Sequence, residues 1–539
     1  MDDGRDFGRR RIRGSEHDPV TTMSKHTSRN TILFNGNVLT LDGRDAVATG
    51  VWIEDGHIKR VLSGHEGVVR GYRTVDLDGA TVLPGFIDPH AHPLALGAAL
   101  RAVDCSPVAV KSIAQIVGRI AEAAADSPES FGGWIRARGY DELLLADRRH
   151  PTAADLDRAA PGRMVRLSHG SGHGDVLSSA ALDAVGIHKD STPPPGATIE
   201  RDADTGKPTG VLFEMGGWLR ERMPRPSSGA LNDYAESSSS AIIAAGVTSI
   251  TDAGRDNTVD RMRLYSGMVA AGRFLPRPTV MLAPGIAYPS PEGVPGVRQG
   301  ATKIAITFSG GEMHPDFEVL VEMISVAHRA DHQIAVHAVE IEAIVMATEA
   351  FAAVGNRSQI AGRRHRIEHA SDCPPEIAKM IASAGLSVVT QPGFIFERGD
   401  RYLSALSSSE GGADPAHLYA IRSLLNAGTT VVGSSDAPFG PMSPLRGIQA
   451  AVTRISSSGQ SIGFEQAVSI GEALRLYGPD AAWVDLQENE AGSIESGKRA
   501  DFAVLERDPR EVESTEISSI SILATLIGGE LVFGSLPGL

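Results

Sequence analysis

Short strand-like runs with turn signals occupy both ends of the chain. From Thr31 onward, apolar stretches alternate with Asn-Gly and Asp-Gly pairs, which are typical of hairpins. A matching pattern returns only near the other end, in "GSIESGKRADFAVLERDP" and "ILATLIGGELVFG". Because neither piece is large enough to close a core alone, we predict one composite β-sandwich built from residues 30–82 and 492–539.

The region between them, residues 83–491, alternates strand-like runs with Ala- and Leu-rich amphipathic stretches. This alternation predicts an α/β fold whose architecture is a TIM-like (β/α)8 barrel of parallel strands. A doubly wound sheet is the alternative, although no Gly-rich phosphate loop follows the first strand. Residues from roughly 105 to 240 are less regular and predict an insertion. The strand candidates outnumber the eight of a barrel: 83–87, 164–170, 247–253, 278–282, 302–308, 334–338, 365–370, 387–392 and 430–438.

Residues 1–29 are polar and predict a disordered tail. The run "RRRIRG" at residues 9–14 leaves a basic anchoring arm as the alternative, and the lack of an apolar stretch argues against a secretory signal. Elsewhere, no apolar run approaches the roughly 20 residues that span a bilayer. We therefore expect a cytoplasmic protein that does not enter a membrane.

Composition and charge narrow the class of protein. Hydrophobic residues make up 42% and charged residues 22% of the chain, which is typical of a globular enzyme. The net charge of −15 argues against nucleic acid as a partner, since its binders normally present a basic face. With Cys105 and Cys373 as its only cysteines, the chain fits a reducing compartment and excludes a disulfide scaffold. We expect a small-molecule substrate as the partner and leave a homodimer open.

Polar residues crowd the end of the first barrel strand, in "LPGFIDPHAHP" at residues 83–93. Residues i and i+2 of a strand face the same way, so His90 and His92 can aim two ring nitrogens at one point. A divalent metal ion is the usual reason for such a pair. Two surface histidines in a turn are the alternative, which the pair alone does not exclude.

Further groups suited to a metal ion stand on other predicted strands. "IAVHA" carries His337, "HRIEHA" carries His369, "VVGSSDAP" carries Asp436 and "TKIAITF" carries Lys303. Each alone has an ordinary explanation, as a core histidine, a turn aspartate or a lysine at a strand edge. The C-terminal ends of barrel strands surround one mouth, so together these groups predict a site for divalent metal. Nitrogen and oxygen ligands of this kind suit zinc, manganese or iron.

Several sequence blocks occur together with these residues: "LPGFIDPHAHP", "RHRIEHAS", "VVTQPGFI", "GSSDAPFGPMSPLRGIQAAVTR" and "AGSIESGKRADFAVLERDP". With them the chain resembles the amidohydrolase superfamily, specifically its amidohydrolase 3, YtcJ-like branch, from about residue 31 to 535. The resemblance implies the barrel with its composite β-sandwich. It also implies metal ligands at His90, His92, His337 and His369, with Asp436 as ligand and proton shuttle. Lys303 falls where many members carry a carboxylated lysine that bridges two metals.

This ligand set predicts hydrolysis by activated water. A divalent cation lowers the pKa of bound water from 15.7 to about 7. Asp436 is then placed to accept the proton and to deliver it to a leaving amine. His173 in "GSGHGDVL" matches a family histidine near the substrate and is a candidate to stabilise the oxyanion, with an ordinary loop histidine as the alternative.

The stretch "HAVE" departs from the commonest YtcJ-like form, in which many members read His-Ala-x-Gly-Asp. His-x-x-Glu on this strand also occurs in mononuclear deaminases of the superfamily, where the glutamate relays a proton. Glu340 is therefore a second catalytic candidate, and its alternative role is to cap or pair with the following helix.

The leading hypothesis is a metal-dependent amidohydrolase that cleaves a C–N bond of an amide, formamide, N-acyl amine or carbamate. It holds one or two divalent ions, with zinc as the first choice. A mononuclear deaminase, a lactone or ester hydrolase on the same site, and a metal-free binding protein are the alternatives, and the intact ligand set argues against the last. Phe394 and Tyr402, after the "VVTQP" strand, are candidates for substrate contact, with plain loop packing as the alternative.

Overall fold

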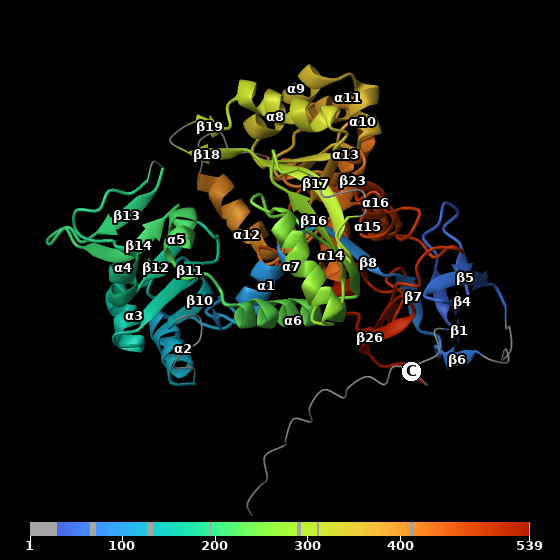
Figure 1. The fold of residues 1–539 in the computed structure, drawn as a ribbon, viewed down its shortest axis with the longest axis horizontal. Helices are drawn as coiled ribbons and strands as arrows, with labels where there is room; N and C mark the ends of the chain where they lie inside the picture. The colour runs from blue at the N-terminus through green and yellow to red at the C-terminus, as the bar shows by residue number, and fades with distance from the viewer. Residues whose placement is uncertain are drawn as a thin grey trace, which may run out of the picture.

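The computed structural model describes residues 30–64, 72–126, 133–194, 196–287, 293–309, 312–408 and 414–537. The predicted polar tail, residues 1–29, lies outside the described residues. Three groups of sheets follow one another across the molecule in Figure 1, with the barrel in the middle.

The central sheet has eight strands, and every neighbouring pair within it is parallel. Its first and last strands approach each other at their C-terminal ends. There the backbone N–H of Asp436 donates to the carbonyl of His90 (2.9 Å), and that of His92 donates to the carbonyl of Ala437 (2.8 Å). The sheet therefore nearly closes into the expected barrel. In spatial order its strands are β8 (Phe86–Ala91), β15 (Val247–Asp252), β16 (Arg277–Leu282), β17 (Arg298–Ala305), β20 (Ile334–Ala338), β21 (Arg366–His369), β22 (Ser387–Thr390) and β23 (Val431–Gly433).

Barrel strands are buried on both faces, which explains their nearly continuous apolar sequences. Every residue of β15 and of β22 is buried, for example. The helices that alternate with the barrel strands along the chain surround them in Figure 1. Several of these helices begin at a residue whose side chain caps the N-terminus, for example Ser227, Thr258 and Asp316. These helices are α6 (Ser228–Ala244), α7 (Val259–Ala270), α8 (Phe317–Arg329), α9 (Ile341–Val354), α10 (Arg357–Gly362), α11 (Pro375–Ala384), α13 (Ile421–Asn426) and α14 (Pro444–Thr453).

Four further helices also follow barrel strands along the chain. They are α1 (Pro93–Leu100), α12 (Gly393–Ser408), α15 (Ile470–Arg475) and α16 (Pro479–Val484). A short antiparallel hairpin, β18 (Thr307–Ser309) with β19 (Glu312–His314), extends from the C-terminal end of β17.

Two sheets at the right of Figure 1 hold the ends of the described chain. The four-stranded sheet has the order β5-β4-β1-β6 and the six-stranded sheet has the order β26-β25-β24-β7-β2-β3. The second sheet joins strands from both ends, since β24 pairs antiparallel with β7. Leu33 and Val51 of the first sheet share one core with Val82, Phe502 and Leu526 of the second. The strands are β1 (Thr31–Phe34), β2 (Asn37–Leu39), β3 (Val47–Ala48), β4 (Gly50–Glu54), β5 (His57–Leu62), β6 (Arg73–Asp76), β7 (Thr81–Pro84), β24 (Phe502–Leu505), β25 (Ile522–Ile527) and β26 (Glu530–Gly534).

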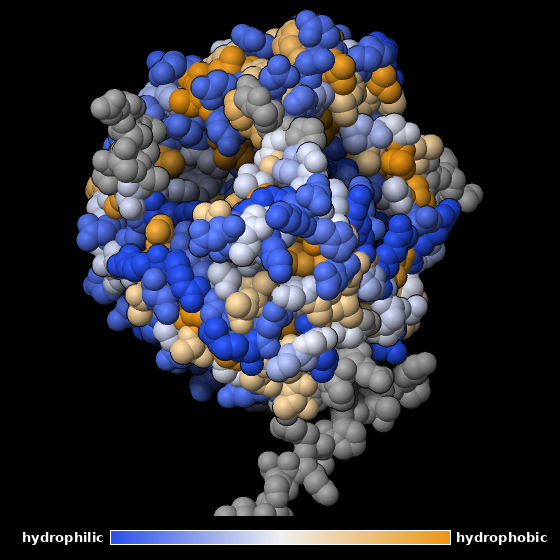
Figure 2. Space-filling model, turned by 90° about the vertical axis from the view of Figure 1, so that its left-hand side faces the viewer, coloured by the Kyte–Doolittle hydropathy of each residue, from blue (hydrophilic) through white to orange (hydrophobic). Residues whose placement is uncertain are grey.

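A separate six-stranded sheet stands between β8 and β15 along the chain, at the left of Figure 1. Seen from its own side in Figure 2, this part of the surface is mainly hydrophilic, with scattered hydrophobic residues. The sheet has the order β13-β14-β12-β11-β10-β9. Its strands are β9 (Val103–Asp104), β10 (Trp134–Tyr140), β11 (Met164–His169), β12 (Gly174–Leu177), β13 (Thr198–Arg201) and β14 (Pro208–Phe213), with helices α2 (Ile113–Asp126), α3 (Ala153–Ala159), α4 (Ser179–Val185) and α5 (Gly216–Arg222).

This sheet corrects one strand candidate. The sequence pattern predicts a barrel strand at residues 164–170, but residues 164–169 form β11 of the insertion. The reason is that β11 pairs parallel with β10 and alternates with helices, so its sequence has the same pattern as a barrel strand. Removing it leaves the eight strands that the barrel needs.

Within the described ranges, no helix combines the length and the apolar character that crossing a membrane requires.

Candidate metal centre

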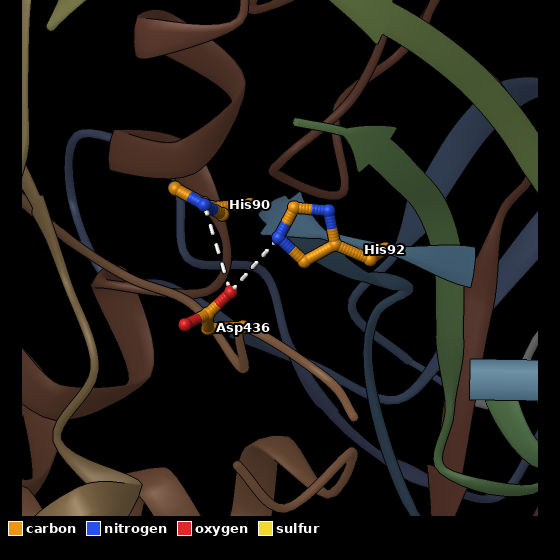
Figure 3. A group of neighbouring side chains, drawn as sticks. All are labelled: His90, His92 and Asp436. Atoms are coloured by element: carbon orange, nitrogen blue, oxygen red, sulfur yellow. Dashed lines mark ion pairs between the residues drawn. The ribbon is translucent and has the colours of Figure 1, made fainter. Parts of the chain in front are cut away.

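Three predicted ligands converge where the barrel closes. His90 is the penultimate residue of β8, His92 immediately precedes α1, and Asp436 follows β23. The Oδ1 atom of Asp436 lies 3.2 Å from Nε2 of His92 and 3.7 Å from Nε2 of His90. Figure 3 shows both imidazoles turned toward this carboxylate. Their ligand atoms all lie within 4.8 Å of one another, so one ion can be shared by the three side chains.

His90 is held with its Nε2 directed into the cluster. Its Nδ1 contacts the Glu368 carboxylate of β21, which leaves Nε2 facing Asp436. Burial lowers the pKa of His90 to about 3, helped by the positive charge of Lys303. The ring is therefore neutral near neutral pH and has a lone pair available on Nε2. A metal-ligating histidine commonly gives its second ring nitrogen to a carboxylate in this way.

His369 of β21 lies beside His90 across the barrel, and His337 of the neighbouring strand β20 lies beside His369. The ring centroids of His90 and His369 are 4.8 Å apart, and those of His337 and His369 are 4.4 Å apart. Nδ1 of His369 lies 2.8 Å from Oε1 of Gln391, which leaves its Nε2 available. Burial lowers the pKa of both His337 and His369, so both rings are neutral ligand candidates.

The backbone is unusual at two of these residues. His369 has φ 76° and Asp436 has φ 50°, in the left-handed region that non-glycine residues rarely adopt. Each such residue costs of order 1–3 kcal/mol, and they persist where the surrounding structure fixes them, often at active sites. Here the positive φ stands at the strand ends that carry the candidate ligands.

Lys303 of β17 lies at the inner side of the cluster. Its Nζ is 3.5 Å from Nε2 of His90, and the residue is only 3% exposed. Burial lowers the pKa of its amine to about 8, against the opposing charge of Glu368. The neutral amine that carbamate formation with CO₂ requires is therefore more populated near neutral pH than in an ordinary lysine.

The carboxylate of Asp436 is ionised. Burial alone would raise its pKa, but the hydrogen bond from His92 and the neighbouring imidazoles of His90 and His369 lower it below the ordinary range. The cluster thus offers imidazole nitrogens and a carboxylate around one point. These are ligands that zinc, manganese and iron accept, so the residues present fit a divalent ion.

The two other catalytic candidates lie away from this cluster. His173, in the loop between β11 and β12, is 71% exposed at its side chain and lies 2.8 Å from Glu214. Its loop nevertheless reaches the barrel mouth, because a Cβ added at Gly172 would lie 3.1 Å from the Phe439 ring, which contacts His92. Glu340 is exposed at the N-cap position of α9 and makes no side-chain cap hydrogen bond there.

The aromatic candidates are part of a small cluster on α12. Phe394 is 5% exposed and packs its ring against Tyr419, with Arg398 above its face. The hydroxyl of Tyr402 lies 2.9 Å from that of Tyr419. Both positions lie in a helix rather than a loop, and a role in substrate contact stays a prediction.

Sequence patterns missed three supporting side chains. Glu368 contacts His90, Gln391 contacts His369, and Asp88 accepts hydrogen bonds from the Ser435 hydroxyl (2.5 Å) and backbone N–H (3.1 Å). Burial raises the pKa of Asp88 to about 7. The sequence does carry one signal for Asp88 and Glu368: each is a carboxylate within a buried strand, and a buried charge needs a partner.

A second group of potential ligands, Asp141, Glu142 and His169, lies in the insertion. The backbone N–H of Ser171 donates to Nδ1 of His169 (3.0 Å), which places the ring hydrogen of a neutral imidazole on Nε2. That Nε2 lies 2.8 Å from the Glu142 carboxylate. The His169 ring and the Glu142 carboxylate are therefore paired with each other, which leaves them less suited to bind a metal ion.

The fold and this cluster define a barrel enzyme of the hydrolase class. A family model described as "Amidohydrolase family" matches residues 73–533, and the chain belongs to that family. It is 30% identical to the N-substituted formamide deformylase of Arthrobacter pascens, over 93% of this chain and 98% of the relative. It is 28% identical to the amidohydrolase YtcJ of Bacillus subtilis (strain 168), over 93% and 99%. These relatives confirm the resemblance to the YtcJ-like branch.

A solved structure supports the architecture. The chain resembles an uncharacterized metal-dependent hydrolase from Pyrococcus furiosus with a TM-score of 0.70 and 23% identity, covering 89% of this chain and 100% of that one. At 23% identity, this similarity is evidence for the fold alone.

Proposed function

We propose that this protein is a metal-dependent amidohydrolase that cleaves a C–N bond of an amide, formamide, N-acyl amine or carbamate. The observation that carries the proposal is the convergence of His90, His92 and Asp436 on one point. His337, His369 and Lys303 complete the ligand set around it. The substrate class is supported by similarity to an N-substituted formamide deformylase.

The site residues divide the chemistry between them. A divalent ion held by these residues would supply Lewis acidity, which lowers the pKa of water toward neutrality and polarises a carbonyl. Asp436, ionised before reaction, accepts the proton from water at its carboxylate and later delivers it to the leaving amine. Glu368 holds the His90 ring in the orientation that leaves Nε2 free. His173 is the candidate donor to the developing oxyanion, from the loop that reaches the mouth.

Zinc is the first choice of metal, and Lys303 is the residue that decides between one ion and two. A neutral lysine amine adds CO₂ and releases a proton, and the resulting carbamate anion would offer two further oxygen ligands, enough to help hold a second ion. Burial at 3% exposure beside His90 favours the neutral amine that this step needs.

We also infer that the two terminal sheets act as one composite β-sandwich. Support comes from their shared core and from the pairing of β24 with β7.

The test combines metal analysis with a substrate panel. Purified protein is assayed for bound zinc, manganese and iron, and then for turnover of formamides, N-acyl amino acids, hydantoins and lactones. The proposal expects at least one divalent ion per chain and release of free amine or acid from a C–N substrate. Release of ammonia from an amino-substituted ring would indicate the deaminase instead, and a chain that binds no metal would contradict both.

A further inference from the structure

A line of buried charges runs through the barrel beneath the metal centre. Arg366 and Glu368 are 1% and 0% exposed, and both belong to β21. Nε of Arg366 forms an ion pair with Oε1 of Glu368 (2.6 Å), whose other oxygen contacts His90. The same guanidinium donates from Nη1 to Oδ1 of Asp485 (2.8 Å), which is also buried. The order is therefore His90, Glu368, Arg366 and Asp485.

Asp485 belongs to a segment at the opposite end of the barrel. Residues 483–486, the end segment, comprise the last two residues of α16 and the two residues after it, and they accept hydrogen bonds from residues just before barrel strands. The Gln333 side chain donates to the carbonyl of Val484 (2.8 Å), and Arg364 donates to that of Trp483 (2.6 Å). These donors precede β20 and β21, so the end segment lies against the N-terminal ends of the strands, whereas the metal centre lies at their C-terminal ends.

Asp485 fixes how the Arg366 side chain is placed. The guanidinium has three partners that offer oxygen atoms: Asp485, Glu368 and the carbonyl of Pro89, which lies 3.1 Å from Nη2. Thr251 of β15 in turn donates its hydroxyl to Asp485 (2.7 Å). A planar, five-donor group of this kind is held in one orientation when several acceptors surround it. Without Asp485, Nη1 would lose its carboxylate partner inside the core and the guanidinium would be less constrained.

The orientation of Arg366 matters because Glu368 is an anion in a dry interior. Glu368 is fully buried, and the guanidinium of Arg366, 2.6 Å away and equally enclosed, is paired with its carboxylate. The carboxylate that orients His90 is thus stabilised by a cation whose own position depends on Asp485. Removing one member of a buried charge network leaves another charge uncompensated.

We propose that Asp485 is a positioning residue for the metal centre, acting on the orientation and metal affinity of His90 through Arg366 and Glu368. The inference rests on the proposed function in one respect, that His90 is a metal ligand. It assigns a role at the site to a residue that touches neither metal nor substrate.

The experiment measures the Zn²⁺ dissociation constant of the full-length protein by competition with a chromophoric chelator. Asp485→Asn keeps the size of the side chain and removes its charge. Loss of an outer carboxylate typically weakens metal binding about 10- to 100-fold, and we expect at least about 10-fold here. Asp485→Glu, which restores the carboxylate, is expected to recover part of the affinity.

Asp501→Asn is the matched control. Asp501 is also buried and also pairs with an arginine, accepting from Arg277 at 2.8 and 3.0 Å, but Arg277 has no contact with Glu368 or His90 among the interactions of the described residues. Both variants should lose stability, which the thermal midpoint records. Only Asp485→Asn should lose Zn²⁺ affinity, so a merely structural role predicts equal affinities in the two variants.

Two outcomes overturn the inference and are distinguishable from failure of the proposed function. If His90→Ala loses Zn²⁺ while Asp485→Asn binds it as the unaltered protein does, the positioning role is wrong and the metal site stands. If the unaltered protein binds no Zn²⁺, both fail. Should Asp485→Asn not fold, Thr251→Val removes only the hydroxyl that orients Asp485, and unchanged affinity in that variant also overturns the inference.

Discussion

The backbone N–H of Asp436 donates to the carbonyl oxygen of His90 across the edge where the last and first barrel strands meet (2.9 Å). This hydrogen bond joins two segments that are far apart in sequence, and it places the Asp436 carboxylate 3.7 Å from the His90 ring. The first ligand pair and the proton acceptor are therefore assembled by closure of the barrel. Partial folding that leaves this edge open would separate them, so metal binding reports on closure.

Replacing His90 and His92 together by alanine should abolish both metal binding and turnover, because two of the three converging ligands are removed. Metal content is measured by elemental analysis and turnover with the best substrate of the panel. His188→Ala, which removes an exposed histidine of the insertion, is the control and should retain both. Full metal and activity in the double variant would show that the site lies elsewhere.

Asp436→Asn should lower kcat by about 100-fold or more, in line with the loss of a general acid–base group. An amide keeps the shape of the side chain but does not accept a proton from water. The thermal midpoint should change little, and metal content is measured in parallel because Asp436 is also a candidate ligand. Asp508→Asn, at a carboxylate of the terminal sheets paired with Arg510, is the control with unchanged kcat. Turnover at the original rate in Asp436→Asn would remove this residue from the mechanism.

Lys303→Ala and Glu340→Gln separate the binuclear amidohydrolase from the mononuclear deaminase. If Lys303 carries a bridging carbamate, its removal should reduce metal content and activity, and a short added carboxylic acid should restore part of both. Glu340, exposed at the start of α9, should then be dispensable. The opposite result, an active Lys303→Ala with an inactive Glu340→Gln, favours a single ion with Glu340 as the proton relay.

The stability of the metal-free protein should depend on pH through Lys303. Burial lowers the pKa of this amine from 10.5 to about 8, so between these values the native protein binds fewer protons than the unfolded chain. Stability therefore gains a contribution that grows as the pH rises from about 8 to about 10.5. Urea midpoints at pH values across this window, in CO₂-free buffer, are compared with those of Lys303→Met. The difference between the two proteins cancels the other titrating groups, and a difference that does not change with pH would contradict the prediction.

His173→Asn should lower kcat, with little effect on stability, because the side chain is 71% exposed. Loss of one donor to a developing oxyanion costs about 100- to 1000-fold in kcat when that donor contributes fully. Thermal midpoint and kcat are measured together, and His188→Ala again serves as the control. An unchanged kcat would make His173 an ordinary loop residue.

Local sequence determined the barrel and the position of its first ligands. Strand-like runs separated by helical stretches predicted parallel strands, and period-two spacing predicted that His90 and His92 point the same way. Both are properties of single elements, so they are readable from short segments. The same local character made residues 164–170 look like a barrel strand, because a parallel strand buried in the insertion has the same pattern as one in the barrel.

Contacts between distant segments were decided only by the tertiary structure. No spacing rule connects Glu368 to His90, or Asp485 to Arg366, since these pairs meet through strand order and through the end segment beneath the barrel. The pKa values of Lys303 and Asp88 are likewise set by burial and by neighbours from other strands. Periodicity fixes which way a side chain points within its own strand, whereas burial, charge pairing and desolvation depend on what the closed barrel places opposite it.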